Sequence, residues 1–134
     1  FALAKDDAGA IHNESLIRDL KQKLHGVEAY RIHTKDLQMP KTTIVVMARE
    51  DWQVRFSIRP GEDMVLSPTE LKKALGKNAS KLPANFLDYN CEIAIGFADD
   101  PEKLYTEDII EIGEFVRENY PGVVIYDQYN KDLW

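Results

Sequence analysis

The sequence predicts an α+β fold with two layers: a mostly antiparallel five-stranded sheet and three helices, in the order α-β-β-β-α-β-α-β. Two observations predict it. Three segments repeat apolar residues at helical spacing, and several short segments are β-branched or alternate between apolar and polar residues. The length of 134 residues and the absence of a domain boundary favour a single domain over residues 13–134. Residues 1–12 are rich in small side chains and are expected to form a flexible lead-in.

The first helix is expected over residues 13–25. Leu16 and Leu20 lie four residues apart and would share an apolar face. Asn13 is a suitable N-cap, and Gly26 is placed to end the helix.

Three strands are expected next, over residues 27–34, 43–47 and 52–58. The second, TIVVM, is apolar throughout and should be buried on both faces. In the third, WQVRFSI, apolar and polar residues alternate, so one face should be buried. Only residues 49–51 separate these two strands, which predicts an antiparallel hairpin whose turn lacks Gly and Asn.

The second helix should begin at Ser67-Pro68-Thr69-Glu70, where Ser is the N-cap and Glu lies three residues later. Gly76 would end it, and residues 77–85 read as a loop.

The last third of the chain is predicted to form a strand, a helix and a strand. Alternation over residues 92–97 indicates a half-buried strand. Apolar residues recur at helical spacing over residues 107–119, after Thr106 as N-cap, and VVIY at residues 123–126 forms the last strand. This ending permits one parallel pair with a right-handed crossover.

Charge is distributed unevenly along the chain. Residues 88–134 carry 12 acidic and 3 basic side chains, whereas residues 1–87 carry a net charge of +3. The spacing of four glutamates in the third predicted helix puts them on one face: Glu107, Glu111, Glu114 and Glu118. Like charges at this spacing destabilise a helix by about 0.2–0.5 kcal/mol per pair, which suggests a use for the charge. A solvated helix face without a partner is the alternative.

The composition narrows the function classes. The single cysteine, Cys91, excludes an intramolecular disulfide and fits a reducing, cytoplasmic location. No apolar run approaches the roughly 20 residues that span a bilayer, so no membrane partner is expected. A net charge of −6 disfavours direct nucleic-acid binding. The sequence contains no Gly-rich phosphate loop, so no cofactor is expected. It contains no metal-ligand spacing, so no metal site is expected.

The histidines leave a catalytic alternative open. His25 at the end of the first helix, or His33 on a predicted strand, could act with Glu28 in a small hydrolase, nuclease or toxin domain. A further alternative is a small-ligand sensory domain that dimerises through a sheet edge.

The strand CEIAIGF, the break ADDP, the acidic helix YTEDIIEIGEFVREN and the closing strand VVIYDQ resemble the immunity proteins of bacterial polymorphic-toxin systems, including contact-dependent growth inhibition. The resemblance implies a protein that binds a cognate toxin, often a basic nuclease, and blocks its active site or substrate surface. It implies no catalytic residues.

The leading interpretation is a non-enzymatic binding protein that neutralises a basic protein partner, with its oligomeric state left open. Carboxylates would mimic phosphates by pairing with Lys and Arg of the partner. The expected partner-binding residues are Asp99, Asp100, Glu107, Asp108, Glu111, Glu114, Glu118 and Asp127. Four aromatic residues flank the acidic helix and would serve as anchors: Tyr105, Tyr126, Tyr129 and Trp134.

Overall fold

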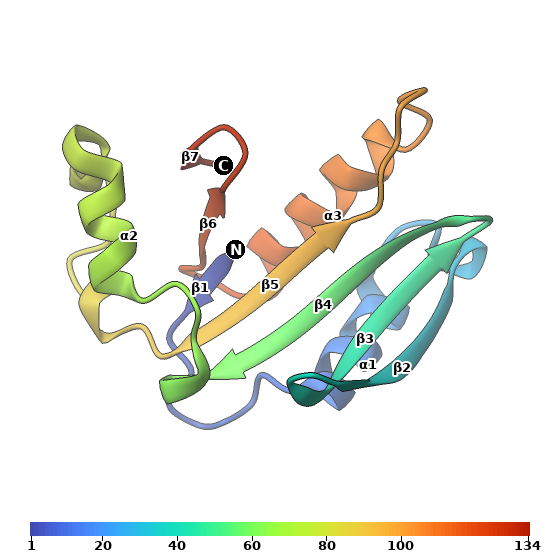
Figure 1. The fold of residues 1–134 in the computed structure, drawn as a ribbon, viewed down its shortest axis with the longest axis horizontal. Coiled ribbons are helices and arrows are strands. Elements are labelled where there is room, and N and C mark those ends of the chain that lie inside the picture. The colour runs from blue at the N-terminus through green and yellow to red at the C-terminus, as the bar shows by residue number, and fades with distance from the viewer.

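The computed structural model describes residues 1–134 and contains three α-helices and one seven-stranded sheet (Figure 1). The sheet order is β2-β3-β4-β5-β1-β6-β7, and every adjacent pair is antiparallel. The strands are β1 (Ala2–Ala4), β2 (Arg31–Gln38), β3 (Lys41–Arg49), β4 (Trp52–Pro60), β5 (Cys91–Phe97), β6 (Val124–Asp127) and β7 (Asp132–Leu133). The helices are α1 (Asn13–Lys23), α2 (Pro68–Leu75) and α3 (Thr106–Asn119).

The α+β class, the three helices and the antiparallel sheet are confirmed, but the five-stranded order is wrong. The short strands β1 and β7 extend the element order to β-α-β-β-β-α-β-α-β-β. β1 lies between β5 and β6, where Ala2 pairs with Ile93 on one side and with Ile125 on the other. β5 and β6 therefore run in the same direction but do not touch as a parallel pair.

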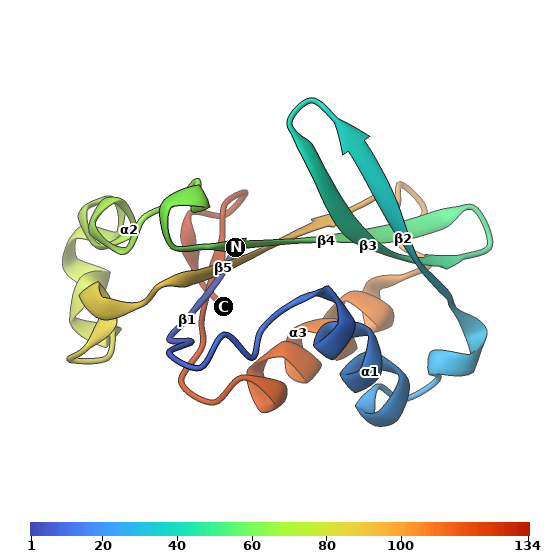
Figure 2. The same cartoon turned by 90° about the horizontal axis from the view of Figure 1, so that it is seen from below.

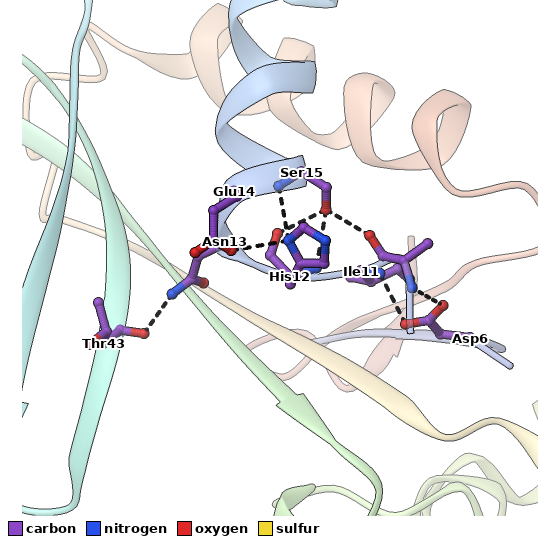
Figure 3. Close-up of polar contacts among 8 residues, drawn as sticks. Asp6, Ile11, His12, Asn13, Glu14, Ser15 and Thr43 are labelled. Atoms are coloured by element: carbon purple, nitrogen blue, oxygen red, sulfur yellow. Dashed lines mark hydrogen bonds and ion pairs between the residues drawn. The ribbon is translucent and has the colours of Figure 1, made fainter. Parts of the chain in front are cut away.

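Residues 1–12 are held in the fold and do not form the expected flexible lead-in. Leu3 is fully buried in the centre of the sheet. The Asp6 carboxylate accepts the backbone N–H groups of Ala10 at 2.9 Å and Ile11 at 3.0 Å (Figure 3). These bonds fix the connection between β1 and α1.

The residue that caps α1 is His12 and not Asn13. His12 Nδ1 accepts the N–H of Ser15 at 3.2 Å, and Ser15 Oγ accepts the N–H of His12 at 3.1 Å, which closes a capping box (Figure 3). Asn13 has another role: its amide donates to the carbonyl of Thr43 at 3.0 Å and ties the start of α1 to β3.

The expected arrangement in two layers, one of helices and one of strands, is only partly met. α1 and α3 cover one face, where they pack with β3, β4 and β5 in the larger apolar cluster (Figure 2). α2 belongs to a second cluster, which uses the opposite faces of β1 and β6. Its members are Leu3, Leu71, Leu75, Phe86, Tyr89, Val124 and Tyr126.

The β3–β4 hairpin forms as predicted. β3 is buried on both faces from Ile44 to Ala48, and the inward residues of β4 are buried in alternation. The turn is made without glycine because Glu50 adopts a left-handed backbone conformation with φ 56°. The strand expected over residues 27–34 is shifted to Arg31–Gln38, since Val27–Ala29 forms a 3₁₀ turn before β2 begins.

β5 is paired unequally on its two sides. β4 pairs with all of β5, from Cys91 to Phe97, whereas β1 pairs only with residues 91–93. The half of β5 that follows Ile93 therefore has a strand on one side only.

Candidate functional site

α3 presents four carboxylates on its solvent side. Its inner side packs in the main apolar cluster through Ile112, Phe115 and Val116. The four outer glutamates are all exposed, and none makes a side-chain hydrogen bond or ion pair within the chain. We call these residues the acidic face of α3: Glu107, Glu111, Glu114 and Glu118. Their charges are hydrated and available to an external cation.

Asp108 does not belong to this face. Its side chain is 12% exposed, and it accepts hydrogen bonds from Arg49 Nη1 at 2.9 Å and from the Tyr30 hydroxyl. Burial and the hydrogen bond to Asp108 raise the pKa of Tyr30, and the negative charge of Asp108 raises the pKa of Arg49. Asp108 thus links α3 to β3 and to the segment before β2.

Two further predicted carboxylates are used in local turns. Asp100 accepts the backbone N–H of Tyr105 at 2.8 Å, just before α3. Asp127 accepts the backbone N–H of Asn130 at 3.2 Å and its side-chain amide at 2.6 Å. Burial acts to raise the pKa of Asp127, but the hydrogen bonds from Asn130 and Tyr129, together with the positive charge of the Phe1 ammonium, outweigh burial and lower the pKa. Of the three flanking carboxylates predicted to bind a partner, only Asp99 is exposed and free of such bonds.

The two histidines of the catalytic alternative lie apart. His25 borders a hollow of about 240 Å³ with Arg49 and Glu107. His33 is exposed on β2, where it pairs with Val46 on the sheet face turned away from α1 and α3. Glu28 is exposed and does not line the hollow. No group of three or more His, Cys, Asp or Glu side chains is arranged to hold a metal ion.

The sheet face turned away from α1 and α3 carries the opposite charge. Alternate residues of β2 and β4 project from it, and four are cationic: Arg31, Lys35, Arg55 and Arg59. Arg59 is neutralised by the fully buried Glu92, with 2.9 Å between Nη1 and Oε2. Arg55 is exposed and has no acidic partner. The acidic face of α3 and these basic side chains therefore lie on opposite sides of the sheet.

A second candidate site lies at the open half of β5. A cavity of about 600 Å³ is bounded by this half of β5, by β6 with the chain end, by Ile109 of α3, and by side chains of β2, β3 and β4 that include Leu37 and Ile44. Eleven of its 17 lining residues are hydrophobic, including Ile95, Phe97, Ile109 and Trp134. We call this cavity the β5 slot. Sequence reasoning missed it, because β1 is too short and too alanine-rich to be recognised as the strand that stops halfway along β5.

The flanking aromatic residues divide into core and surface. Tyr105 and Tyr126 are buried, and the Tyr105 ring stacks on Trp52 with 4.5 Å between ring centroids. Trp134 remains 45% exposed, and Tyr129 is 91% exposed. The two surface aromatics border the β5 slot, so they are available as anchors there and not on the acidic face of α3.

No family model, no curated protein and no solved structure matches this chain. None of its helices combines the length and the apolar character that crossing a bilayer requires.

Proposed function

We propose that this chain is a non-enzymatic binding protein that neutralises a basic protein partner, such as a nuclease-like bacterial toxin, in the reducing cytoplasm. The observation that carries the proposal is the acidic face of α3: four exposed carboxylates on one face, without partners in their own chain. The resemblance of the last third of the chain to immunity proteins supports the same role.

The physical basis is electrostatic. A row of carboxylates on a rigid helix attracts a basic surface over a distance comparable to the Debye length, about 8–10 Å at physiological salt. Lys and Arg side chains that normally bind phosphate groups can pair with these carboxylates, which would block a nuclease surface. Because the carboxylates are exposed, the attraction should be sensitive to salt and should act mainly on the association rate.

The test uses a partner identified by co-purification with this chain. In the variant Glu111→Lys/Glu114→Lys, two attractive contacts become repulsive, which weakens binding by about 2 kcal/mol, or roughly 30-fold, at low salt. The matched control Glu62→Lys/Glu70→Lys makes the same change of net charge at two exposed sites beside α2 and away from α3. Equal affinities and equal salt slopes for the two double variants would disprove the role of α3.

A further inference from the structure

Over β2, β3 and β4, the sheet face turned away from α1 and α3 has no helix packed on it within residues 1–134 (Figure 2). The apolar cluster of α2 involves β1 and β6 but no residue of these three strands. Three exposed side chains of this area are cationic and form no ion pair: Arg31, Lys35 and Arg55. We call these three residues the basic face of β2–β4. Its positive charge is not compensated within the chain.

The basic side chains stand over an apolar floor. Ile44 and Val46 of β3 project to the same side of the sheet and are 3% and 1% exposed. Lys35 is paired with Ile44, and Arg55 is paired with Val46. Long cationic side chains cover apolar surface with their stems and keep the charged ends in water. The charges of this face are therefore presented outward, where a partner can reach them.

The acidic face of α3 is complementary to the basic face in charge and in length. The row of carboxylates from Glu107 to Glu118 is about 16 Å long, at about 1.5 Å per helical residue. Arg31 and Lys35 lie about 14 Å apart along β2, at about 3.4 Å per residue. Arg55 lies two strand spacings, about 10 Å, from β2. One α3 helix can therefore reach all three cations.

An exposed apolar residue accompanies the acidic face. Ile110 of α3 is 48% exposed and lies about one helical turn from Glu107 and from Glu114. In the isolated chain this part of its side chain meets water. Against the basic face it would contact the apolar stems of the cationic residues and the half-buried Leu37. This contact matters because exposed ion pairs alone contribute little to binding.

We propose that a second copy of this chain docks the acidic face of its α3 on the basic face of β2–β4. The two faces lie on opposite sides of the sheet, so each contact leaves one acidic and one basic face free. Copies therefore add head to tail, and the assembly grows with protein concentration. The inference does not rest on the function proposed for the acidic face. A basic protein partner bound to α3 would compete with the second copy.

The first experiment measures the mass of the chain in solution by sedimentation at physiological salt. At about 0.5 mM, the weight-average mass should exceed that of a monomer by at least about 1.5-fold. Lys35→Glu/Arg55→Glu should remain monomeric, because carboxylates then face carboxylates. The matched control Lys72→Glu/Lys73→Glu makes the same change of net charge at exposed sites on α2 and should associate like the unchanged chain. A monomeric unchanged chain, or equal masses for the two double variants, would overturn the inference.

The second experiment mixes two variants that should not associate alone. Glu111→Lys/Glu114→Lys reverses the acidic face, and Lys35→Glu/Arg55→Glu reverses the basic face. In an equal mixture the two reversed faces attract each other, and so do the two unchanged faces. The weight-average mass of the mixture should therefore return to that of the unchanged chain. A mixture that stays monomeric would refute the pairing of these two faces.

The third experiment separates this inference from the proposed function and from a different ligand. Lys35→Glu/Arg55→Glu keeps its acidic face and should bind a co-purified basic partner as tightly as the unchanged chain. Failure to self-associate would leave that binding intact, and failure to find such a partner would leave self-association intact. A single-stranded DNA of about 12 nucleotides is the probe for a phosphate backbone. DNA binding that Lys35→Glu/Arg55→Glu abolishes, by a chain that stays monomeric, would overturn the inference in favour of a nucleic acid.

Discussion

The indole of Trp134 packs directly against Gly113 on α3. The substitution Gly113→Ala therefore tests this contact. Glycine inside a helix costs about 1 kcal/mol relative to alanine, so the substitution alone should stabilise α3 by that amount. A methyl group at Gly113 would, however, lie 2.5 Å from Cη2 and 2.7 Å from Cζ3 of Trp134. The indole must therefore move away from the helix.

The cost of moving Trp134 follows from its burial. The side chain is 45% exposed, so roughly half of the area that a tryptophan can bury, about 100 Å², is in contact with the protein. At about 25 cal/mol per Å², losing this contact costs about 2.5 kcal/mol. Gly113→Ala should therefore destabilise the chain by about 1.5 kcal/mol. In a Trp134→Ala background, where the clash is absent, the same change should stabilise it by about 1 kcal/mol.

Urea unfolding of the four chains in this cycle measures both values, and the emission of Trp134 should shift to the red in Gly113→Ala as the indole becomes more solvated. Trp52 is 2% exposed and gives a constant background. A stabilising effect of Gly113→Ala in both backgrounds would refute the contact between Trp134 and α3.

Two further predictions concern the interior. Glu92→Ala should destabilise the fold by about 2–4 kcal/mol, because Arg59 loses its ionic partner and the N–H of Leu66 loses the acceptor that lies at 2.7 Å. The control Glu102→Ala, at an exposed site, should change the urea midpoint little. Burial raises the pKa of the Cys91 thiol to about 11, so the thiol stays protonated at pH 8. An aromatic disulfide reagent should therefore react with it at pH 8 only after unfolding in guanidinium, and rapid reaction of the native chain would contradict its burial.

The elements that the sequence predicted correctly are those whose own residues carry the signal. β4 alternates through Trp52, Val54 and Phe56, and α3 repeats its apolar residues at helical spacing, so both could be located from local patterns. β1 and β7 have three and two residues and no such pattern. They become strands only because distant segments offer them hydrogen bonds, which is a tertiary effect that local propensity does not contain.

The residues of the candidate site also fall into two groups: those predictable from a local pattern and those fixed by distant contacts. The exposure of Glu111 and its neighbours follows from helix periodicity, since the opposite side of α3 is apolar. The use of Asp108 by Arg49 and Tyr30 depends on contacts 59 and 78 residues apart, so charge alone made it look available. Asp127 is different: its bonds to Asn130 are local, and an Asp placed three residues before an Asn could have been read as a turn.

The insertion of β1 between β5 and β6 also governs how the chain reaches this fold. The bonds between Phe1 and Tyr126 span 125 residues, so the pairing of β1 with β6 has the greatest sequence separation in the sheet. Contacts of this kind require closure of a long loop before they stabilise anything, which slows folding relative to the local β2–β3 and β3–β4 hairpins. During that interval β5 and β6 both have open edges, and such edges pair readily with other chains. Insertion of the short strand β1 is therefore expected to be a late step of folding, and it removes the open edges of β5 and β6 through which the sheet could aggregate.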